Sequence, residues 1–237
     1  MKLLDIQGLS KSFGGVSALS KVTVESHAGE ILGMIGPNGS GKTTFVNVVS
    51  GHLRQDAGTL RLGETNIAGM RPNQLAKAGL CRTYQAVRIF SALSVAQNID
   101  AAGLMLRDQG LSPTELTELT HWLRLDSSLA KTAGSLTLFE QRRLELLMRL
   151  VLRPRLIMLD EPVGGLAVTE VSDMIQLLQE LKSRCSIFVI EHTMRVIREL
   201  ADRVIVLIAG EKVADGPPAD ILRNQRVVAE YLGSAHA

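Results

Sequence analysis

The hydrophobic and polar positions of the chain follow two periods, one typical of buried strands and one typical of helices. Continuous apolar runs predict strands that are buried on both faces. These runs occupy residues 30–36, 155–160, 186–191 and 203–209. Between the second and third runs, one apolar stripe marks a predicted helix over 169–184: Val171, Met174, Ile175, Leu178 and Leu181. Strands that alternate with helices predict an α/β fold with a mostly parallel sheet and right-handed crossovers.

Two other regions depart from this alternation. Residues 3–9 and 21–25 predict short strands separated by turns, and residues 59–67 predict a strand followed by a turn. From residue 91 to about 131 the pattern is helical, with predicted helices over 94–107 and 112–125. The second helix has a clear start, because Ser112 can cap it, Pro113 suits its first position and Glu115 completes a capping box.

These patterns predict one domain over residues 1–237. A helical insert at 91–150 splits its core into residues 1–90 and 151–237. A hydrophobic content of 46% and a charged content of 21% are those of an ordinary globular protein. The formal charge of +2 gives no reason to expect a nucleic-acid partner.

The cysteines and the apolar runs also bear on location. Cys81 and Cys185 lie far apart and lack a metal-binding spacing, which suits a reducing compartment. No apolar run approaches the length of a membrane span, and the N-terminus lacks the apolar core of a signal peptide. We therefore expect a soluble chain, which could still dock onto a membrane protein.

A phosphate-binding loop is the most specific motif. Residues 36–44, GPNGSGKTT, match the pattern G-x-x-x-x-G-K-[ST] between a predicted buried strand and a predicted helix. Backbone N–H groups of such a loop point at phosphate oxygens, and the helix N-terminus adds partial positive charge. A glycine-rich turn without ligand is the alternative, which this context disfavours. The predicted nucleotide-binding residues are Gly36, Pro37, Asn38, Gly39, Ser40, Gly41, Lys42, Thr43 and Thr44.

Within this loop, Lys42 is expected to reach the outer phosphates and the Thr43 hydroxyl to ligate Mg²⁺. The second half of such a site is acidic. Asp160 and Glu161 end a buried strand, so Asp160 is predicted to hold the Mg²⁺ shell and Glu161 to orient or deprotonate an attacking water. Without the phosphate loop, a charged strand terminus would be the better interpretation.

Two further residues are candidates for contact with the nucleotide. His192 follows the next buried strand, at the sheet edge where open α/β folds bind ligands, which favours contact with a γ-phosphate. Phe13 precedes a Gly-Gly turn, and two interpretations stay open for it: stacking on adenine, or packing in the core or turn.

These motifs, in this order, resemble the ATP-binding-cassette family, the nucleotide-binding subunits of ABC transporters. The resemblance runs from about residue 3 to residue 232 and includes RTYQAVRIFSALSVAQNI, LIMLDEP and IEHTM. Within the family the chain looks most like the ATPases of branched-chain amino acid importers. That closer resemblance is carried by SKSFGGVSAL, CRTYQAVRIF, QRRLEL and NQRVVAEYLG. Amide, urea and lipopolysaccharide systems share parts of it.

The resemblance implies a P-loop NTPase core with an N-terminal antiparallel β subdomain and an inserted helical subdomain. It implies an ATP hydrolase with ATP and Mg²⁺ as cofactors, working as a head-to-tail dimer that encloses two ATP molecules. Gln85 would sense Mg²⁺ and the γ-phosphate, and residues 86–98 would receive a helix from integral-membrane permease subunits. The chain would act peripherally at the cytoplasmic face of the cell membrane, indirectly served by a substrate-binding protein.

One motif departs from the family pattern. The signature L-S-G-G-Q is replaced, position by position, by Leu136, Thr137, Leu138, Phe139 and Glu140. Thr137 keeps a hydroxyl, but Leu138 and Phe139 add side chains where close backbone approach is needed. Thr137 and Glu140 form a predicted capping box, in which Glu140 satisfies the free donors of the helix.

A comparison of interaction energies favours a signature that binds ATP weakly. A cap and a favourable dipole placement contribute about 1 kcal/mol each to the helix. A carboxylate about 4 Å from one phosphate charge costs about 4 kcal/mol at an effective dielectric constant of about 20. Ala167 also stands where the dimer-contact loop of the family usually has Asp or Asn.

We therefore expect an asymmetric pair, in which a second, different ABC ATPase subunit supplies the sound signature; a tolerated variant is the alternative. Other functions stay open as alternatives: a non-transport cassette protein, a P-loop kinase, or a regulatory ATP-binding subunit with weak hydrolysis. A single cassette without a heptad run disfavours the first, and the set Gln85, Glu161 and His192 disfavours the second.

Overall fold

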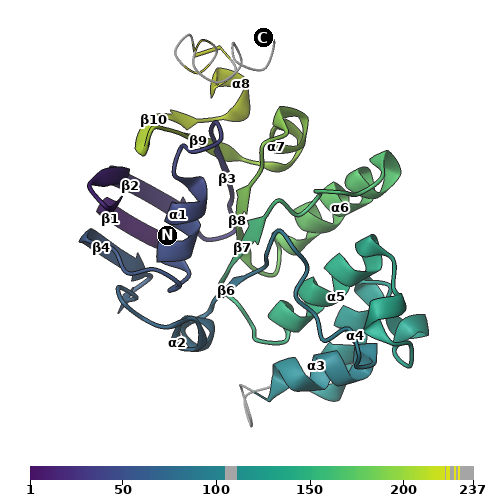
Figure 1. Cartoon of the computed structure of the whole chain (residues 1–237). Helices are drawn as coiled ribbons and strands as arrows, with labels where there is room; N and C mark the ends of the chain where they lie inside the picture. Colours follow the sequence, from purple (N-terminus) through teal and green to yellow (C-terminus); the bar gives the residue numbers. More distant parts are fainter. Residues whose placement is uncertain (105–110, 222, 225–226, 228, 230–237) are drawn as a thin grey trace.

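A mixed sheet forms the centre of the molecule. The computed structural model describes residues 1–237 except 105–110, 222, 225–226, 228 and 230–237. Within these residues the sheet has six strands in the order β10–β9–β3–β8–β7–β6 (Figure 1). They are β3 (Ile31–Ile35), β6 (Leu80–Arg82), β7 (Leu156–Asp160), β8 (Ser186–Ile190), β9 (Arg203–Ile208) and β10 (Glu211–Gly216). Neighbours from β9 to β6 pair in parallel, and only β10 runs antiparallel at one edge. The predicted mostly parallel sheet is confirmed.

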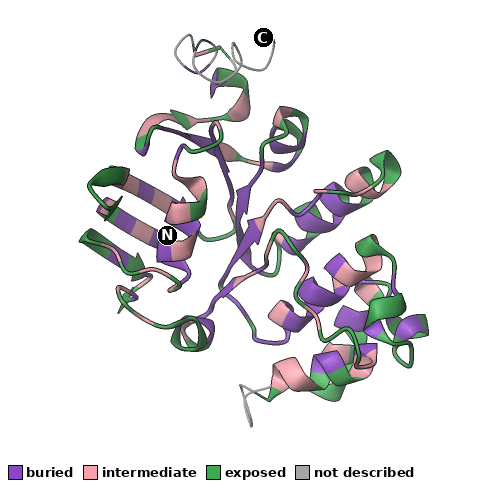
Figure 2. Ribbon diagram, viewed as in Figure 1, coloured by how far each residue is buried: buried purple, intermediate pink, exposed green. Residues whose placement is uncertain are grey.

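The apolar runs form strands because both faces of the sheet are covered. Every residue of β3 and β8 is buried, and Figure 2 shows the central strands as a continuous buried layer. On one face, α1 (Lys42–Val49) packs between the central sheet and a second sheet. Phe45 of α1 stacks on Phe188 of β8, with ring centroids 5.5 Å apart. This contact fixes the helix that follows the phosphate-loop motif.

The second sheet is antiparallel, in the order β2–β1–β4–β5. Its strands are β1 (Lys2–Phe13), β2 (Val16–His27), β4 (Ala57–Leu62) and β5 (Thr65–Asn66). The antiparallel N-terminal subdomain is confirmed, but β1 and β2 are longer than the predicted strands at 3–9 and 21–25. Register shifts along the β1–β2 pair interrupt the regular alternation that sequence patterns depend on.

Helices α3 (Val95–Gly103), α4 (Pro113–Trp122) and α5 (Leu138–Leu150) lie together on one side of the molecule (Figure 1). The predicted capping box at α4 is confirmed: Ser112 N–H donates to Glu115 Oε2 (2.8 Å) and Glu115 N–H to Ser112 Oγ (3.3 Å). Residues 105–107 of the predicted first helix lie outside the described residues. The boundaries of the helical subdomain at 91–150 stay a prediction, because one apolar cluster joins Val95 and Leu144 to Ile187 of the sheet.

The remaining helices are α2 (Pro72–Ala78), α6 (Val168–Leu181), α7 (Met194–Leu200) and α8 (Pro218–Ile221). On α6 the predicted stripe faces the core, since Met174, Ile175, Leu178 and Leu181 are buried and Val171 packs against the same cluster. Among the helices that the structure describes, none combines the length and apolarity that crossing a membrane requires.

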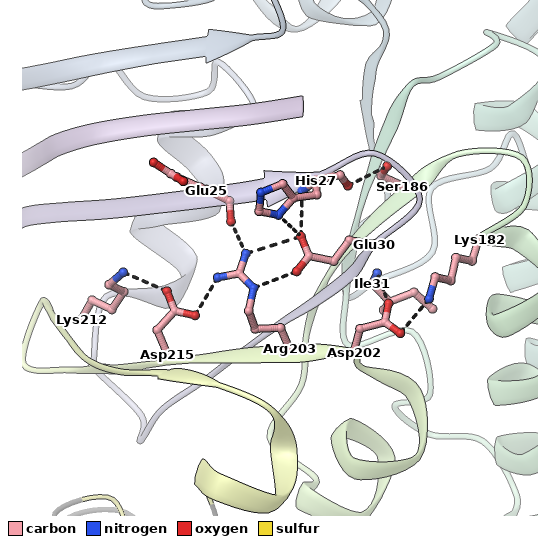
Figure 3. Close-up of polar contacts among 10 residues, drawn as sticks. All are labelled: Glu25, His27, Glu30, Ile31, Lys182, Ser186, Asp202, Arg203, Lys212 and Asp215. Carbon is pink, nitrogen blue, oxygen red and sulfur yellow. Dashed lines mark hydrogen bonds and ion pairs between the residues drawn. The ribbon is translucent and has the colours of Figure 1, made fainter. Parts of the chain in front are cut away.

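The amino-terminal edge of the parallel strands is closed by ion pairs (Figure 3). Arg203 Nε donates to Glu30 Oε1 (2.8 Å), Nη1 to Asp215 Oδ1 (2.6 Å), and Nη2 to the backbone carbonyl of Glu25. Lys212 adds a contact of 2.9 Å to Asp215. These pairs tie β9 and β10 to the end of β2. At the opposite, carboxyl-terminal edge, Glu161 and His192 follow the ends of β7 and β8.

Candidate functional site

The loop between β3 and α1 is shaped by glycines that tolerate no side chain. A Cβ on Gly36 would lie 2.0 Å from the carbonyl oxygen of Leu207, and one on Gly41 would lie 2.4 Å from that of Ala18. Gly39 and Gly41 also have φ angles of +78° and +102°, in the left-handed region that glycine adopts without strain. The backbone therefore curls tightly ahead of the N-terminus of α1.

Lys42 and Ser40 place polar groups inside this curl. Lys42 Nζ donates to the carbonyl oxygens of Gly36 (2.6 Å) and Pro37 (2.9 Å). Burial lowers the pKa of Lys42, and the charges of Glu161 and Asp160 oppose that shift. Ser40 Oγ is buried and has no hydrogen-bond partner among the described residues. Such a loop fits an anionic ligand that would take up these donors.

A cavity of about 390 Å³ opens beside the loop. It brings together segments that lie far apart in the sequence, since Glu161 follows β7 and His192 follows β8. Its lining residues are Ala18, Asn38, Gly39, Ser40, Gly41, Lys42, Thr43, Thr44, Glu161 and His192. Residues 38–44 of the predicted loop thus meet Glu161 and His192, two of the three predicted residues from the later strands, at one sheet edge.

Glu161 is held from two sides. Gln85 Nε2 donates to Glu161 Oε2 (2.9 Å), and His192 Nδ1 lies 3.5 Å from Glu161 Oε1. The backbone of Glu161 has a φ of 49°, which turns the chain sharply after the strand. Gln85, Glu161 and His192 therefore converge, although the sequence places Gln85 76 residues before Glu161.

Asp160 lies one residue earlier and has a partner that the sequence analysis missed. Its Oδ2 accepts a hydrogen bond of 2.8 Å from Arg82 Nη2, at the end of β6. Asp160 is not among the described residues that line the cavity, but its charge acts on Lys42. No motif indicated Arg82, because β6 is a three-residue strand whose place comes from pairing with β7.

Phe13 lies at the tip of the β1–β2 hairpin. It is exposed, and Lys11 Nζ lies 5.5 Å from the centroid of its ring. Packing in the core is thereby excluded for Phe13. Of the described residues in this hairpin, Ala18 and not Phe13 lines the cavity, so stacking on adenine stays a prediction.

The segment 136–140 forms the start of α5. The predicted capping box is confirmed: Glu140 N–H donates to Thr137 Oγ1 (3.2 Å), and Thr137 N–H donates to Glu140 Oε2 (2.8 Å). The hydrogen bond from the Thr137 backbone lowers the pKa of Glu140. Glu140 therefore satisfies the N–H of Thr137, whereas the N–H groups of Leu138 and Phe139 have no acceptor within the helix.

The side chains of Leu138 and Phe139 differ in position. Leu138 is exposed, beside Gly165. Phe139 packs against the core cluster, with the guanidinium of Arg143 4.5 Å from its ring centroid. Leu138 thus covers the helix start, whereas Phe139 contributes to packing within the chain. Ala167 precedes α6 and makes no side-chain hydrogen bond at the start of that helix. Its backbone N–H donates to Glu170 Oε2 (2.9 Å).

A comparison with known families identifies this arrangement. Residues 19–164 match the family described as "ABC transporter", which covers the loop, Gln85, the start of α5 and both carboxylates. The chain belongs to the ABC transporter family. As an ABC transporter ATPase, it is an ATP-binding protein and an ATP hydrolase.

The similar proteins confirm the predicted subfamily. The high-affinity branched-chain amino acid transport ATP-binding protein BraF of Pseudomonas aeruginosa is 32% identical, with 98% of each chain covered. LivG of Escherichia coli, of the same description, is 34% identical, with 98% of each chain covered. The lipopolysaccharide export system ATP-binding protein LptB of Haemophilus influenzae is 29% identical over 98% of both chains.

Solved structures show the same fold. A nucleotide-free ATP-binding cassette from an ABC transporter superimposes with a TM-score of 0.87 at 26% identity, covering 98% of this chain and 99% of that one. The ADP conformation of another such cassette gives a TM-score of 0.86 at 27% identity, with the same coverage. The predicted P-loop NTPase core of this ABC ATPase is confirmed.

Proposed function

We propose that this chain binds Mg-ATP and hydrolyses it to power import of branched-chain amino acids or related small polar solutes. The observation that most directly supports this proposal is the cavity in which the P-loop, Glu161 and His192 meet. The similarity to BraF and LivG supports the substrate class.

The residues of the P-loop suit the phosphates of ATP. The N–H groups of residues 36–44 and the N-terminus of α1 would donate to phosphate oxygens. Lys42 would exchange the carbonyls of Gly36 and Pro37 for the outer phosphates. Phe13, exposed at the hairpin tip, would stack on adenine.

The donor set of the site fits Mg²⁺. Thr43, Gln85 and Asp160 supply a hydroxyl, an amide and a carboxylate oxygen, which are hard ligands. The described residues contain no group of three or more His, Cys, Asp or Glu side chains that could by itself hold a metal ion. That fits an ion held by few protein oxygens together with phosphates and waters. When bound, Mg²⁺ would neutralise charge that develops on the phosphate oxygens.

Glu161 is our candidate for the residue that orients or deprotonates the attacking water. Its two carboxylate oxygens lie beside Gln85 and His192, which hold it at the mouth of the P-loop. His192 would contact the γ-phosphate from the neighbouring strand end.

The decisive experiment is Glu161→Gln in the assembled transporter. Loss of a general base costs about 10²–10⁴-fold in rate, so ATP turnover should fall by about 100-fold or more while Mg-ATP binding is retained. Glu118→Gln on α4 is the matched control and should leave turnover unchanged. Unchanged turnover in Glu161→Gln would move the active chemistry to another subunit.

We further propose partners for the chain. Integral-membrane permease subunits would dock beside residues 86–98, where Phe90 is exposed, at the cytoplasmic face of the membrane. A substrate-binding protein would act through them. A second, different ABC ATPase would complete the nucleotide sites, because the start of α5 carries Leu138 and Glu140 in place of glycine and glutamine.

The asymmetric pair is tested by purifying the chain with and without the second, different ABC ATPase subunit. We expect nucleotide-driven dimers and rapid hydrolysis only from the mixture. Strong ATPase activity from this chain alone would show that its signature is a tolerated variant. ATP binding without turnover in every combination would favour a regulatory ATP-binding subunit.

A further inference from the structure

Arg82 joins the candidate Mg²⁺ aspartate to helix α1. Its Nη2 donates to Asp160 Oδ2 (2.8 Å), and its Nη1 donates to Asn47 Oδ1 (2.6 Å) and Ser50 Oγ (3.1 Å). The pair is shielded, since the side chains of Arg82 and Asp160 are 8% and 17% exposed. A planar guanidinium reaches these acceptors at once, which the single ammonium of a lysine cannot do.

The Arg82 side chain is itself held by an aromatic ring. Two guanidinium groups lie over the ring of Tyr84, with Arg82 Cζ 4.9 Å and Arg88 Cζ 4.4 Å from its centroid. Both distances are within the range of cation–π attraction. Arg82 is therefore fixed by its ring contact as well as by its hydrogen bonds.

A chain of hydrogen bonds closes this arrangement. The Ser50 hydroxyl donates to Val46 O (2.6 Å), so its oxygen is left to accept from Arg82 and from His52 Nδ1 (3.0 Å). With Nδ1 as the donor, a neutral His52 leaves Nε2 to accept from Tyr84 OH, which lies 2.9 Å away. Burial, followed by the charge of Arg82, lowers the pKa of His52, in agreement with this tautomer.

We propose that Arg82 is a positioning residue for Asp160. Its Nη2 binds Oδ2 while Asn47 and Ser50 hold its Nη1, and this leaves Oδ1 in one orientation for the Mg²⁺ shell. Mg²⁺ demands near-octahedral geometry, so a carboxylate that rotates freely would serve it poorly. Groups that orient metal ligands typically change metal affinity by about 10–100-fold when mutated. This inference rests on the proposed Mg-ATP site.

The test measures ATP affinity of the full chain by calorimetry, once with EDTA and once with Mg²⁺. Arg82→Gln and Arg82→Lys should leave the ATP affinity in EDTA unchanged. The increase in ATP affinity that Mg²⁺ gives, called the gain from Mg²⁺ below, should fall by about 10-fold or more. Arg61→Gln, at an exposed position of β4 where Nη2 contacts Glu64 O, is the matched control and should keep the full gain.

The lysine variant separates geometry from charge. If Arg82→Lys keeps the wild-type gain from Mg²⁺, charge alone matters and the inference is wrong. A wild-type chain that binds ATP without any gain from Mg²⁺ would also overturn it. A wild-type chain that binds no ATP under either condition would instead refute the proposed function.

A double mutant tests whether Arg82 acts through Asp160. Asp160→Asn should remove the gain from Mg²⁺, and adding Arg82→Gln should then change the affinity no further, because both act through one contact. A further loss of about 5-fold or more would show that Arg82 acts independently of Asp160. Thermal melts of all variants in EDTA should confirm a folded chain.

Discussion

The P-loop, residues 36–44, and the signature segment, residues 136–140, both lead into a helix, but they are built on different principles. In the P-loop, the positions of Gly36 and Gly41 are enclosed by backbone carbonyls within 2.4 Å of an added Cβ. In the signature segment, Leu138 is exposed and Thr137 and Glu140 cap the helix with their own side chains. The P-loop presents bare backbone, whereas the signature segment satisfies the N–H groups of Thr137 and Glu140 with its own side chains.

This difference shows which positions the fold itself protects. A side chain at Gly36 would disrupt the packing between the loop and β9 whether or not ATP is present. The Leu138 side chain is exposed beside Gly165, so the monomer accommodates a side chain at this position. Position 138 can therefore vary while the monomer stays folded, whereas positions 36 and 41 cannot accept a side chain without a shift of the backbone.

A substitution at Gly36 should lower the stability of the chain more than any other change considered below. Gly36→Ala should lower the free energy of unfolding by about 3 kcal/mol or more, because its Cβ meets the Leu207 carbonyl at 2.0 Å. Gly39→Ala, in the same loop but with no atom within 4 Å of its Cβ, should lose only about 1 kcal/mol from its positive φ. Urea denaturation without nucleotide measures both. Equal losses would contradict the role given to packing.

A pH dependence of stability should arise in α5. Burial raises the pKa of Glu145 to about 7, against an ordinary value of 4.5, and Arg149 opposes the shift. The folded state therefore binds the proton more tightly, so stability from this group is full below pH 4.5 and is lost as pH rises through about 7. The loss amounts to about 3 kcal/mol.

Urea denaturation between pH 5 and pH 8 should show this loss in the wild type and a flatter profile in Glu145→Gln. Burial also raises the pKa of Glu191, so the difference between the two profiles isolates Glu145. Parallel profiles would assign the pH dependence to other groups.

Restoring the family residues in the signature segment should strengthen its contact with a partner cassette. Leu138→Gly with Glu140→Gln should raise ATP-driven association with a cassette partner by about 10-fold, equivalent to about 1.4 kcal/mol. Adding Phe139→Gly should give no further gain, because the ring packs on Arg143 and the core. Analytical ultracentrifugation with Mg-ATP measures association. No change in the double variant would favour a fully tolerated signature.

The smallest effect concerns the cap. Thr137→Ala should cost about 1 kcal/mol of stability, and Ser112→Ala at α4, which removes a similar capping box, should cost about the same. Only Thr137→Ala should also alter ATP-driven association. Thermal unfolding and the association assay together measure both properties, and identical behaviour of the two variants would remove any special role for Thr137.

Much of the fold could be predicted where residues close together in the sequence determine the local structure. The continuous apolar runs became β3, β7, β8 and β9, because a strand covered on both faces needs apolar residues throughout. The capping boxes at residues 112 and 137 formed as predicted, because they join residues three positions apart. The glycine and lysine spacing likewise predicted the loop at the cavity.

What could not be predicted depends on contacts distant in the sequence. The short β6 has no periodicity to read, and α2 and α7 carry too few turns for a clear stripe. Arg82 meets Asn47 and Asp160 only after β6 pairs with β7, so no spacing indicates it. The packing of Phe139 against the core likewise depends on how α5 meets α6.

The backbone of Glu161 has a consequence for how this position evolves. Its φ of 49° costs an L-residue about 1 kcal/mol or more, and asparagine or glycine would adopt it more easily. A lineage that no longer needed hydrolysis would therefore gain stability by exchanging this glutamate. That exchange would also remove the carboxylate that Gln85 and His192 contact, so at this position backbone ease and the polar contacts of the site favour different residues.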